Sequence, residues 1–330
     1  MKNLVDRNQL PATRVVVVGY HEIACQALLS LDEHNVAIVA YFPNPLRVGQ
    51  ADYWYRDAVN IAEKLEIPVE DPLLPAQDEL FSEFLIDENV DVLMSCFSAT
   101  VFGRKSLESV RLATNFHNSD LPFYKGRAAP IRALQDGQSS IALCYHHMTS
   151  SVDEGHLIDR IEIKLLPKMT ICHLYLLVAE AQSELLEKWI PKIAAKQWSS
   201  FFQKKSFEHC TDPSLIRGKV SIGALGFLDF SEPASRIDAV LRAFSNPFPG
   251  GWFECNGKKI HVIEWEIEIG IQSKDTEWEF LPILTDQSLK IPLRDGALHI
   301  HVAALDGRWL SHRQLAKYLI PYVTRHKLPE

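Results

Sequence analysis

The chain has 330 residues, of which 47% are apolar and 23% charged, a composition typical of a globular protein with a full core. Its formal net charge of −8 at pH 7 argues against the concentrated basic face of a nucleic-acid-binding protein. No window approaches 18 consecutive apolar residues, and the start of the chain lacks the apolar segment of a signal peptide. We therefore predict a cytoplasmic protein without a membrane span.

The first part of the chain alternates short apolar strands with amphipathic helices. Strands are predicted at 14–20, 36–42, 90–97 and 112–117, and helices at 22–31, 56–65 and 77–89. This alternation predicts βαβ units and a Rossmann-like parallel sheet. Ligands bind such sheets at the carboxyl ends of the strands, so residues 19–21, 95–100 and 115–119 are expected at one functional edge.

The rest of the chain predicts a second, smaller domain. Two extended stretches within 139–165 flank the loop TSSVDEG (149–155), and a long helix at 170–195 follows. After it come a helix at 233–244 and short strands separated by Gly, Asn and Asp turns, which are typical of a small β-rich, OB-like domain. We predict an α/β catalytic domain over 1–203, a linker over 204–218 and the C-terminal domain over 219–330.

Several common chemistries are not predicted. The first strand-to-helix turn, GYHEIA, lacks the G-x-G-x-x-G pattern of a dinucleotide site, and no G-x-x-x-x-G-K-[ST] phosphate loop occurs. The six cysteines are scattered without a C-x-x-C pair, which favours buried free thiols over disulfides or a zinc site. His146 and His147 are consecutive and point to opposite faces of a strand, and carboxylates at metal-ligand spacing are missing, so we predict no metal.

Asn115 and His117 are the main candidates for catalysis. They are two residues apart and share one face where a predicted strand meets a loop, and Asp153 lies in a loop that can reach the same cleft. Together they offer an amide donor, a base that titrates near neutral pH and a carboxylate. A buried structural histidine beside a turn-forming asparagine is the alternative. The set has no serine or cysteine nucleophile, so it suits direct attack of one bound substrate on another.

The loop YKGRAAP (124–130) follows directly and carries two cations, Lys125 and Arg127. Two interpretations are open: a solvated basic loop, or an anion clamp for a phosphate-bearing substrate, in which Arg is the better bidentate partner.

In this order, these elements resemble the folate-dependent formyltransferase family. That family carries N-x-H-x-S-x-L-P, then a loop with Tyr or Arg and Gly, then D-x-G; here these are NFHNSDLP (115–122), YKGRAAP and DEG (153–155). The stretch NPFPGGWFECNGKKI (246–260) is similar to the family's C-terminal domain, so the resemblance covers nearly the whole chain. Asp120, where the family usually has Leu or Tyr, and SCFSATVF (95–102) depart from the family pattern.

The resemblance implies an enzyme that takes its formyl group from N10-formyltetrahydrofolate. It implies that Asn115, His117 and Asp153 stabilise the tetrahedral intermediate and move protons. The folate-binding positions it implies are Phe97, Ser98, Ala99, Val101, Val152 and Gly155, and the acceptor-binding positions are Ser119, Tyr124, Lys125 and Arg127.

The acceptor that the resemblance implies is the amine of a nucleotide-linked amino sugar. The chain looks most like the nucleotide-sugar N-formyltransferases, such as the UDP-4-amino-4-deoxy-L-arabinose formyltransferase domain of lipopolysaccharide biosynthesis. Methionyl-tRNA formyltransferase is the main alternative, but it needs a basic surface, and FPNPLRVGQADYWYRD (42–57) is not a basic run. A hydroxyornithine amine as acceptor, a non-catalytic folate or nucleotide binder, and a homodimer also remain open.

Overall fold

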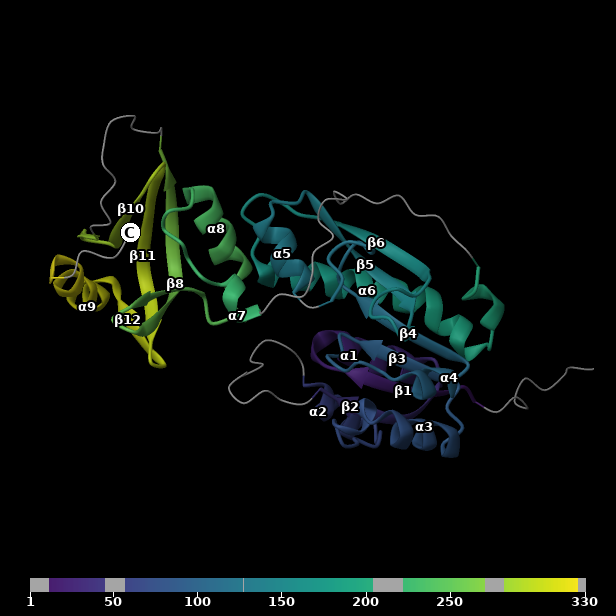
Figure 1. Ribbon diagram of the computed structural model, residues 1–330. Coiled ribbons are helices and arrows are strands. Elements are labelled where there is room, and N and C mark those ends of the chain that lie inside the picture. The colour runs from purple at the N-terminus through teal and green to yellow at the C-terminus, as the bar shows by residue number, and fades with distance from the viewer. Residues whose placement is uncertain (1–11, 45–56, 127, 204–221, 271–281, 326–330) are drawn as a thin grey trace, which may run out of the picture. The chain divides into compact units, whose positions relative to one another are not determined.

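The computed structural model describes residues 12–44, 57–126, 128–203, 222–270 and 282–325, which form two compact units (Figure 1). The first unit groups Met1–Gly126, Ser140–Lys164 and Leu176–Arg217. The second groups Arg127–Ser139, Leu165–Tyr175 and Gly218–Glu330.

The first unit is built on a mixed sheet with the strand order β2-β1-β3-β4-β5-β6. Its strands are β1 (Arg14–Gly19), β2 (Ala37–Pro43), β3 (Val92–Cys96), β4 (Leu112–His117), β5 (Ser140–His147) and β6 (Leu157–Lys164). The first four pair in parallel, whereas β5 and β6 form an antiparallel hairpin at the β4 edge. The predicted Rossmann-like domain is confirmed.

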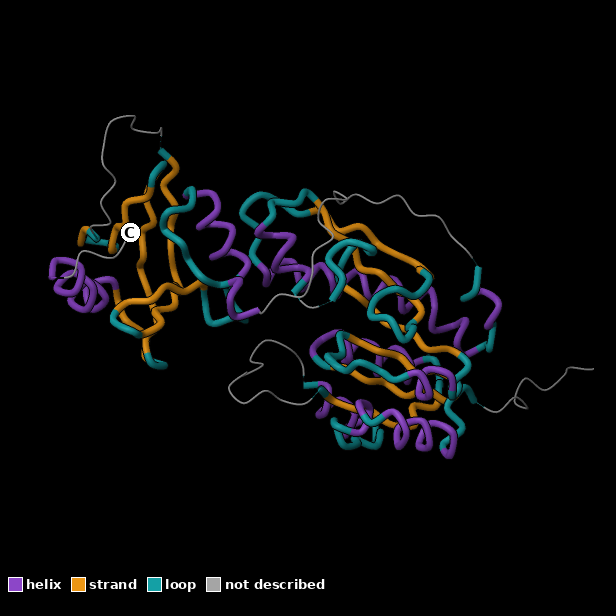
Figure 2. The backbone as a smooth tube through the Cα atoms, in the orientation of Figure 1, coloured by secondary structure: helices purple, strands orange, loops and turns teal. Residues whose placement is uncertain are grey.

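Helices cover both faces of this sheet (Figures 1 and 2). The consecutive valines of β1 point alternately to the two faces and are all buried, so both faces must be covered. The helical elements are α1 (His21–Glu33), α2 (Ala58–Lys64), η1 (Leu74–Ala76), α3 (Asp78–Asp87), α4 (Arg104–Glu108), α6 (Ile171–Ala194) and η2 (Trp198–Ser200). On one face Phe81 and Leu85 of α3 pack with Val16 and Val18 of β1. On the other face, the indole of Trp189 in α6 packs against the ring of Tyr145.

The second unit holds an antiparallel sheet with the order β7-β8-β11-β10-β9, and β12 pairs with β11. The strands are β7 (Gly251–Cys255), β8 (Lys258–Ile269), β9 (Ile283–Leu284), β10 (Leu289–Leu293), β11 (Gly296–Leu305) and β12 (Arg308–Ser311). Its helices are α5 (Ala129–Gln135), α7 (Ile222–Leu225), α8 (Ala234–Ala243) and α9 (His312–Arg325). Apolar side chains of α8 and α9 join those of the strands in one core, which confirms the predicted β-rich C-terminal domain.

Two segments of the predicted catalytic domain (1–203), Arg127–Ser139 and Leu165–Tyr175, group with the second unit. The physical reason is a set of hydrogen bonds from side chains to backbone carbonyls. The amide of Gln135 in α5 donates to the carbonyl of Leu225 (2.7 Å), and the guanidinium of Arg236 in α8 donates to the carbonyl of Gln135. Arg242 of α8 donates to the carbonyl of Met169 (3.0 Å). The second unit therefore includes the helix that follows the YKGRAAP loop.

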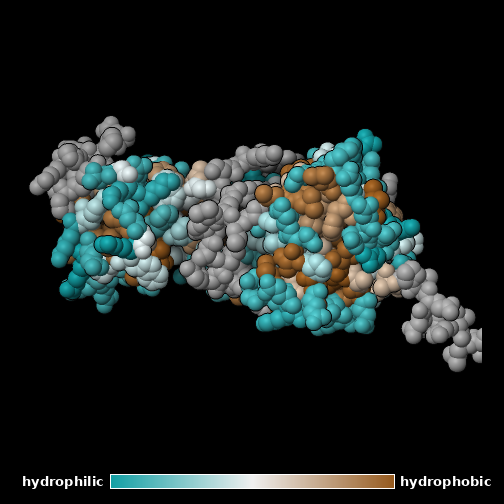
Figure 3. Space-filling view, turned by 90° about the horizontal axis from the view of Figure 1, so that it is seen from below, coloured by the Kyte–Doolittle hydropathy of each residue, from teal (hydrophilic) through white to brown (hydrophobic). Residues whose placement is uncertain are grey.

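Apolar side chains also reach the surface, and Figure 3 shows them in brown patches among hydrophilic groups. Leu73, Leu80 and Ile86 are each more than half exposed. Among the described residues, no helix has the length and hydropathy needed to cross a bilayer.

Candidate active site

Three parallel strands end together at the predicted functional edge. Gly19 of β1 lies opposite Cys96 of β3, and Cys96 lies opposite Phe116 of β4. The approach of β1 to β3 is close, since a Cβ added at Gly19 would lie 2.0 Å from the carbonyl oxygen of Cys96. Only glycine therefore fits at the first strand-to-helix turn, although the turn carries no phosphate-loop pattern.

Asn115 and His117 lie on one face of β4, as their spacing predicts. The same face carries Ala113, which belongs to the apolar cluster that contains Phe81 and Leu85 of α3. Thr114 lies on the opposite face, where its hydroxyl oxygen accepts a hydrogen bond from the hydroxyl of Tyr145 (3.2 Å). In the antiparallel register His146 lies opposite Asn115. This register places His146, rather than its neighbour His147, on the same face as Asn115 and His117.

Asp153 reaches this face from the loop that connects β5 and β6. Its backbone adopts φ +55°, a left-handed conformation that aspartate tolerates better than most residues. A Cβ at Gly155 would lie 1.7 Å from the carbonyl oxygen of His147, so only glycine lets the loop pass this close to β5. Asp153 Oδ2 accepts the backbone N–H of Gly126 (2.8 Å), and this bond ties the loop to the YKGRAAP segment.

His146 holds the amide of Asn115. Its Nδ1 lies 2.7 Å from the carbonyl oxygen of His147, and because a carbonyl only accepts, Nδ1 carries the proton. In the neutral ring Nε2 is then an acceptor, and Asn115 Nδ2 donates to it at 3.1 Å. The amide therefore keeps a fixed orientation with its second N–H available to a ligand.

Burial keeps His146 neutral. Its side chain is 2% exposed, and this desolvation, followed by the nearby charge of His117, lowers the pKa of His146 from 6.5 to about 4. The carboxylate of Asp153, with Oδ1 3.8 Å from Nε2, opposes that shift only weakly. At neutral pH the ring remains an acceptor for Asn115.

Two buried polar atoms at the site have no hydrogen-bond partner among the described residues: His117 Nε2 and Ser119 Oγ. The closest acidic atom to His117 Nε2 is Asp153 Oδ2, at 3.6 Å, which is beyond hydrogen-bond distance. Buried polar groups without partners are rare in native proteins, and ligands are one way in which they are satisfied. This geometry is compatible with a bound substrate that bonds to both atoms.

The predicted folate-binding segment follows β3. Phe97 adopts φ +59°, and the amide oxygen of Asn44, which follows β2, accepts from Ser98 Oγ (3.2 Å) and from the backbone N–H of Ala99 (3.3 Å). The side chains of Val101 and Val152 are 62% and 45% exposed, so both apolar surfaces face solvent in the free protein. Asn44 was not predicted, because a polar residue after a buried strand is its only signal in the sequence.

The predicted acceptor-binding residues differ in exposure. Ser119 and Tyr124 are fully buried, whereas Lys125 is half-buried and its ammonium lies 3.0 Å from a carboxylate oxygen of Glu154. This ion pair partly neutralises the cation that was expected to bind an anion. Arg127 lies outside the described residues.

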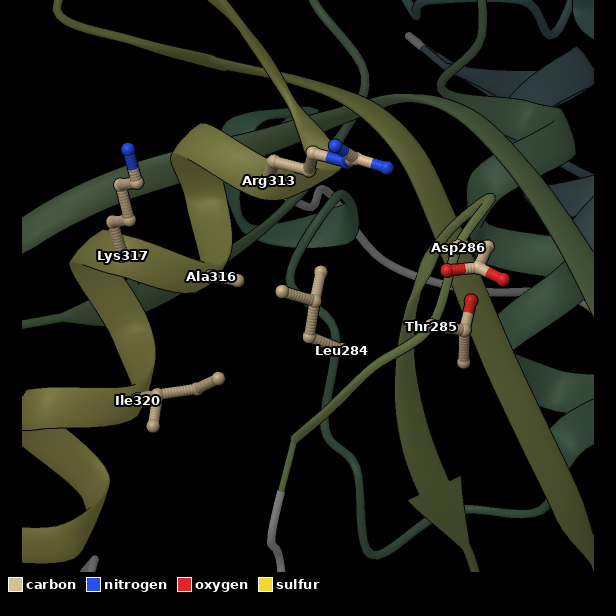
Figure 4. Close-up of a pocket in the computed structure, with 7 residues that line it drawn as sticks. All are labelled: Leu284, Thr285, Asp286, Arg313, Ala316, Lys317 and Ile320. Carbon is tan, nitrogen blue, oxygen red and sulfur yellow. The ribbon is translucent and has the colours of Figure 1, made fainter.

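A cavity of about 900 Å³ lies in the second unit, between α9 and the β9 segment (Figure 4). Arg313 and Lys317 of α9 line it on one side and Asp286 on the other. None of the predicted site residues lines this cavity. Among the described residues, no group of three or more His, Cys, Asp or Glu side chains is arranged to hold a metal ion.

Comparisons with known proteins point to one family. The family model described as "Formyl transferase" matches residues 5–190, and the model described as "Formyl transferase, C-terminal domain" matches residues 223–317. Two separate models therefore match consecutive parts of the chain, in the order that the sequence resemblance implies.

Solved structures share this fold at low sequence identity. WlaRD, a sugar 3N-formyl transferase crystallised in the presence of dTDP and 5-N-formyl-THF, has a TM-score of 0.61 and 16% identity over 91% of this chain and 100% of its own. An N-formyltransferase from Helicobacter canadensis in complex with folinic acid and dTDP-3-aminofucose has a TM-score of 0.59 and 16% identity, covering 87% and 99%. A HypX variant from Aquifex aeolicus has a TM-score of 0.61 and 15% identity over 94% of this chain, which spans 48% of that protein.

Proposed function

From the premise that this chain belongs to the formyl transferase family, we propose that it transfers a formyl group from N10-formyltetrahydrofolate to the amine of a nucleotide-linked amino sugar. The observation that carries the proposal is the convergence of Asn115, His117 and Asp153 on one face at the carboxyl end of β4. Ser119 Oγ makes no hydrogen bond to His117, so this pair has no Ser–His nucleophile geometry.

The site residues suit attack by a neutral amine on a formyl carbon. As the new C–N bond forms, the formyl oxygen gains negative charge, and the second N–H of Asn115 stabilises it. His117 Nε2 takes the proton that the attacking nitrogen loses and returns it to the folate nitrogen as the old C–N bond breaks. Asp153, 3.6 Å away, stabilises the imidazolium while it carries the proton.

The chain's own residues fit a folate donor at the β3 edge. Asn44 holds the segment that contains Ser98 and Ala99, and the exposed Val101 and Val152 offer apolar surface for a flat ring. The bound donor supplies the activated formyl group. The folates named for WlaRD and the Helicobacter canadensis enzyme support this assignment.

A nucleotide-linked amino sugar is the acceptor that charge and comparison support best. WlaRD was crystallised in the presence of dTDP, and the Helicobacter canadensis N-formyltransferase in complex with dTDP-3-aminofucose. The net charge of −8 disfavours the acceptor stem of a charged tRNA, since affinity for nucleic acid arises mainly from phosphate contacts with Lys and Arg. Methionyl-tRNA remains the second candidate, because the family resemblance includes that enzyme.

The described cysteines support activity in the cytoplasm. Cys96 and Cys255 are buried thiols that form no disulfide. Buried unpaired thiols are typical of proteins from reducing compartments.

The direct test is a substrate screen. UDP-, dTDP- and GDP-linked amino sugars are incubated with N10-formyltetrahydrofolate and the purified protein, and mass spectrometry follows the gain of one formyl group. We expect at least one nucleotide amino sugar to be formylated. Formylation of charged methionyl-tRNA alone would refute the proposed acceptor, and tetrahydrofolate release with no formylated acceptor would refute the transfer itself.

A further inference from the structure

Asp120 brings a fully buried charge into the loop that carries the site. It lies three residues after His117, and its side chain is 0% exposed. Asp120 Oδ1 lies 3.0 Å from Nη2 of Arg160 on β6, a side chain that is itself 10% exposed. Taking both charges out of water is costly, and well-packed apolar side chains would stabilise the fold at least as well. A role in stability alone does not account for this pair.

The sheet register shows what the pair holds. His117 lies opposite Cys144 of β5, and Cys144 lies opposite Arg160 of β6, so the three side chains form one row on the catalytic face. The chain leaves β4 after His117, at one end of this row, and the carboxylate of Asp120 contacts Arg160 at the other end, on β6. The segment 118–121 therefore crosses β5 and is tied down on the far strand.

The interior of the segment is tightly folded. The backbone N–H of Phe123 donates to the carbonyl of Asp120 (2.9 Å), and that of Leu121 donates to the carbonyl of Ser119 (3.1 Å). The side chain of Leu121 packs with Cys144 beneath it. The two backbone hydrogen bonds are local, and the packing of Leu121 is non-directional. The ion pair between Asp120 and Arg160 is directional and connects the segment to β6, two strands away from β4.

We propose that Asp120 and Arg160 form a clamp that positions His117 and Ser119, so that the pair controls turnover rather than stability. Both are positioning residues: they act on the site through the segment 118–121. The effect on rate rests on the proposed formyl transfer. The geometric effect does not, because the clamp sets the position of the His117 ring in the free protein.

The test replaces both charges by apolar groups of similar size. In Asp120→Leu/Arg160→Met the melting temperature should stay at or above that of the wild type. The kcat should fall on the order of 10²-fold, because small misplacements of catalytic groups cost about this much. The KM for the folate donor should change little, since the implied donor-binding residues lie outside the segment 118–121 that the clamp holds. Arg160→Lys keeps the ion pair and should recover most of kcat.

The matched control is Arg14→Met/Glu88→Leu, which removes an ion pair (2.9 Å) of the same unit at the amino end of β1 and should leave kcat unchanged. Wild-type kcat in the clamp double variant would overturn the proposal. So would a parallel loss of melting temperature and kcat that Arg160→Lys does not recover, since the pair would then be purely structural.

A second readout separates the clamp from the reaction. The ¹⁵N chemical shifts of the His117 ring in the unliganded protein should move in the double variant and not in the control. If the wild type formylated none of the amino sugars, the proposed function would fail, and the ring shifts alone would decide the clamp: unchanged shifts would overturn it. If the double variant does not fold, Arg160→Gln, which keeps a donor but no charge, takes its place in both measurements.

Discussion

The amide of Asn115 is bound on one side and available on the other, which is the arrangement that electrostatic preorganisation requires. One N–H is fixed on His146 Nε2, and the other is the proposed donor to the developing oxyanion. We expect Asn115→Ala to lower kcat by about 10²–10³-fold, the usual effect of removing one oxyanion donor. Circular dichroism should show an unchanged fold, and steady-state formyl transfer measures the loss.

Asn60→Ala is the control, because Asn60 is exposed on α2, its amide donates to Asp57 Oδ2 (3.3 Å), and it has no role in the proposed chemistry. It should retain near-wild-type kcat. Wild-type activity in Asn115→Ala would contradict the assignment of Asn115.

His146 gives the fold a pH dependence of its own. Its pKa is lowered to about 4 in the folded protein from an ordinary value of 6.5, so the unfolded chain binds more protons between these values. Stability from this group is therefore complete above pH 6.5 and is lost as the pH falls toward 4. The expected loss is about 3 kcal/mol, from 1.36 kcal/mol per pKa unit.

Urea unfolding at a series of pH values measures this effect. In His146→Gln, which keeps an acceptor for Asn115, the decline between pH 6.5 and 4 should be smaller than in the wild type. The exposed His34 provides the control, and His34→Gln should keep the wild-type decline. An identical decline in His146→Gln would show that His146 is not buried as a neutral ring.

At the scale of elements, the loop between β5 and β6 can pass close to β5 only because residue 155 is glycine and has no Cβ. Gly155→Ala would place a Cβ 1.7 Å from the carbonyl oxygen of His147, so the loop and β5 must separate. Because Asp153 is two residues away, we expect kcat to fall on the order of 10²-fold and stability to fall by about 1–3 kcal/mol. Kinetics and urea unfolding measure the two effects.

Gly223→Ala is the matched glycine substitution. No atom lies within 4 Å of a Cβ at Gly223, which is inside α7, so the change should be neutral or stabilising by up to about 1 kcal/mol. Equal behaviour of the two alanine variants would contradict the steric argument at Gly155.

The elements that the sequence predicts well are those whose pattern is long and strong. The helix α6 begins and ends within one residue of the predicted limits 170–195, and α3 and α8 end within two residues of theirs. The short strands β9 and β12 were not predicted, because two or four largely exposed residues carry no periodic signal and depend on pairing with β10 and β11. The helix α9 was also missed, although its residues are amphipathic.

The sequence predicts which side chains meet at the site, but not the backbone hydrogen bonds and the strand register that hold them. The same-face rule placed Asn115 and His117 together, and the loop position of Asp153 allowed it to reach them. The hydrogen bond from the N–H of Gly126 to Asp153 has no sequence signal, because every non-proline residue offers a backbone N–H. The choice of His146 over His147 required the register between β4 and β5, which a single sequence does not specify.

At the scale of the whole molecule, the chain order and the compact units do not coincide. The site residues of the first unit are separated along the chain by 127–139, which groups with the second unit, and α6 begins in the second unit and continues in the first. The chain therefore passes between the units several times.

At the same scale, the net charge predicts that the protein does not bind nucleic acid. With 34 Lys and Arg against 42 Asp and Glu, the protein should repel polyanions, and Lys125 beside the site is already paired with the carboxylate of Glu154. We expect excess uncharged tRNA to leave the initial rate of nucleotide-sugar formylation unchanged, even at about 50 mM salt, where phosphate contacts are strongest. The same assay at about 200 mM salt is the control, because counterion release would weaken any tRNA binding there. Inhibition by tRNA at low salt that disappears at high salt would reveal a nucleic-acid surface and favour the tRNA acceptor. Equal rates with and without tRNA, at both salt concentrations, would support a small-molecule acceptor.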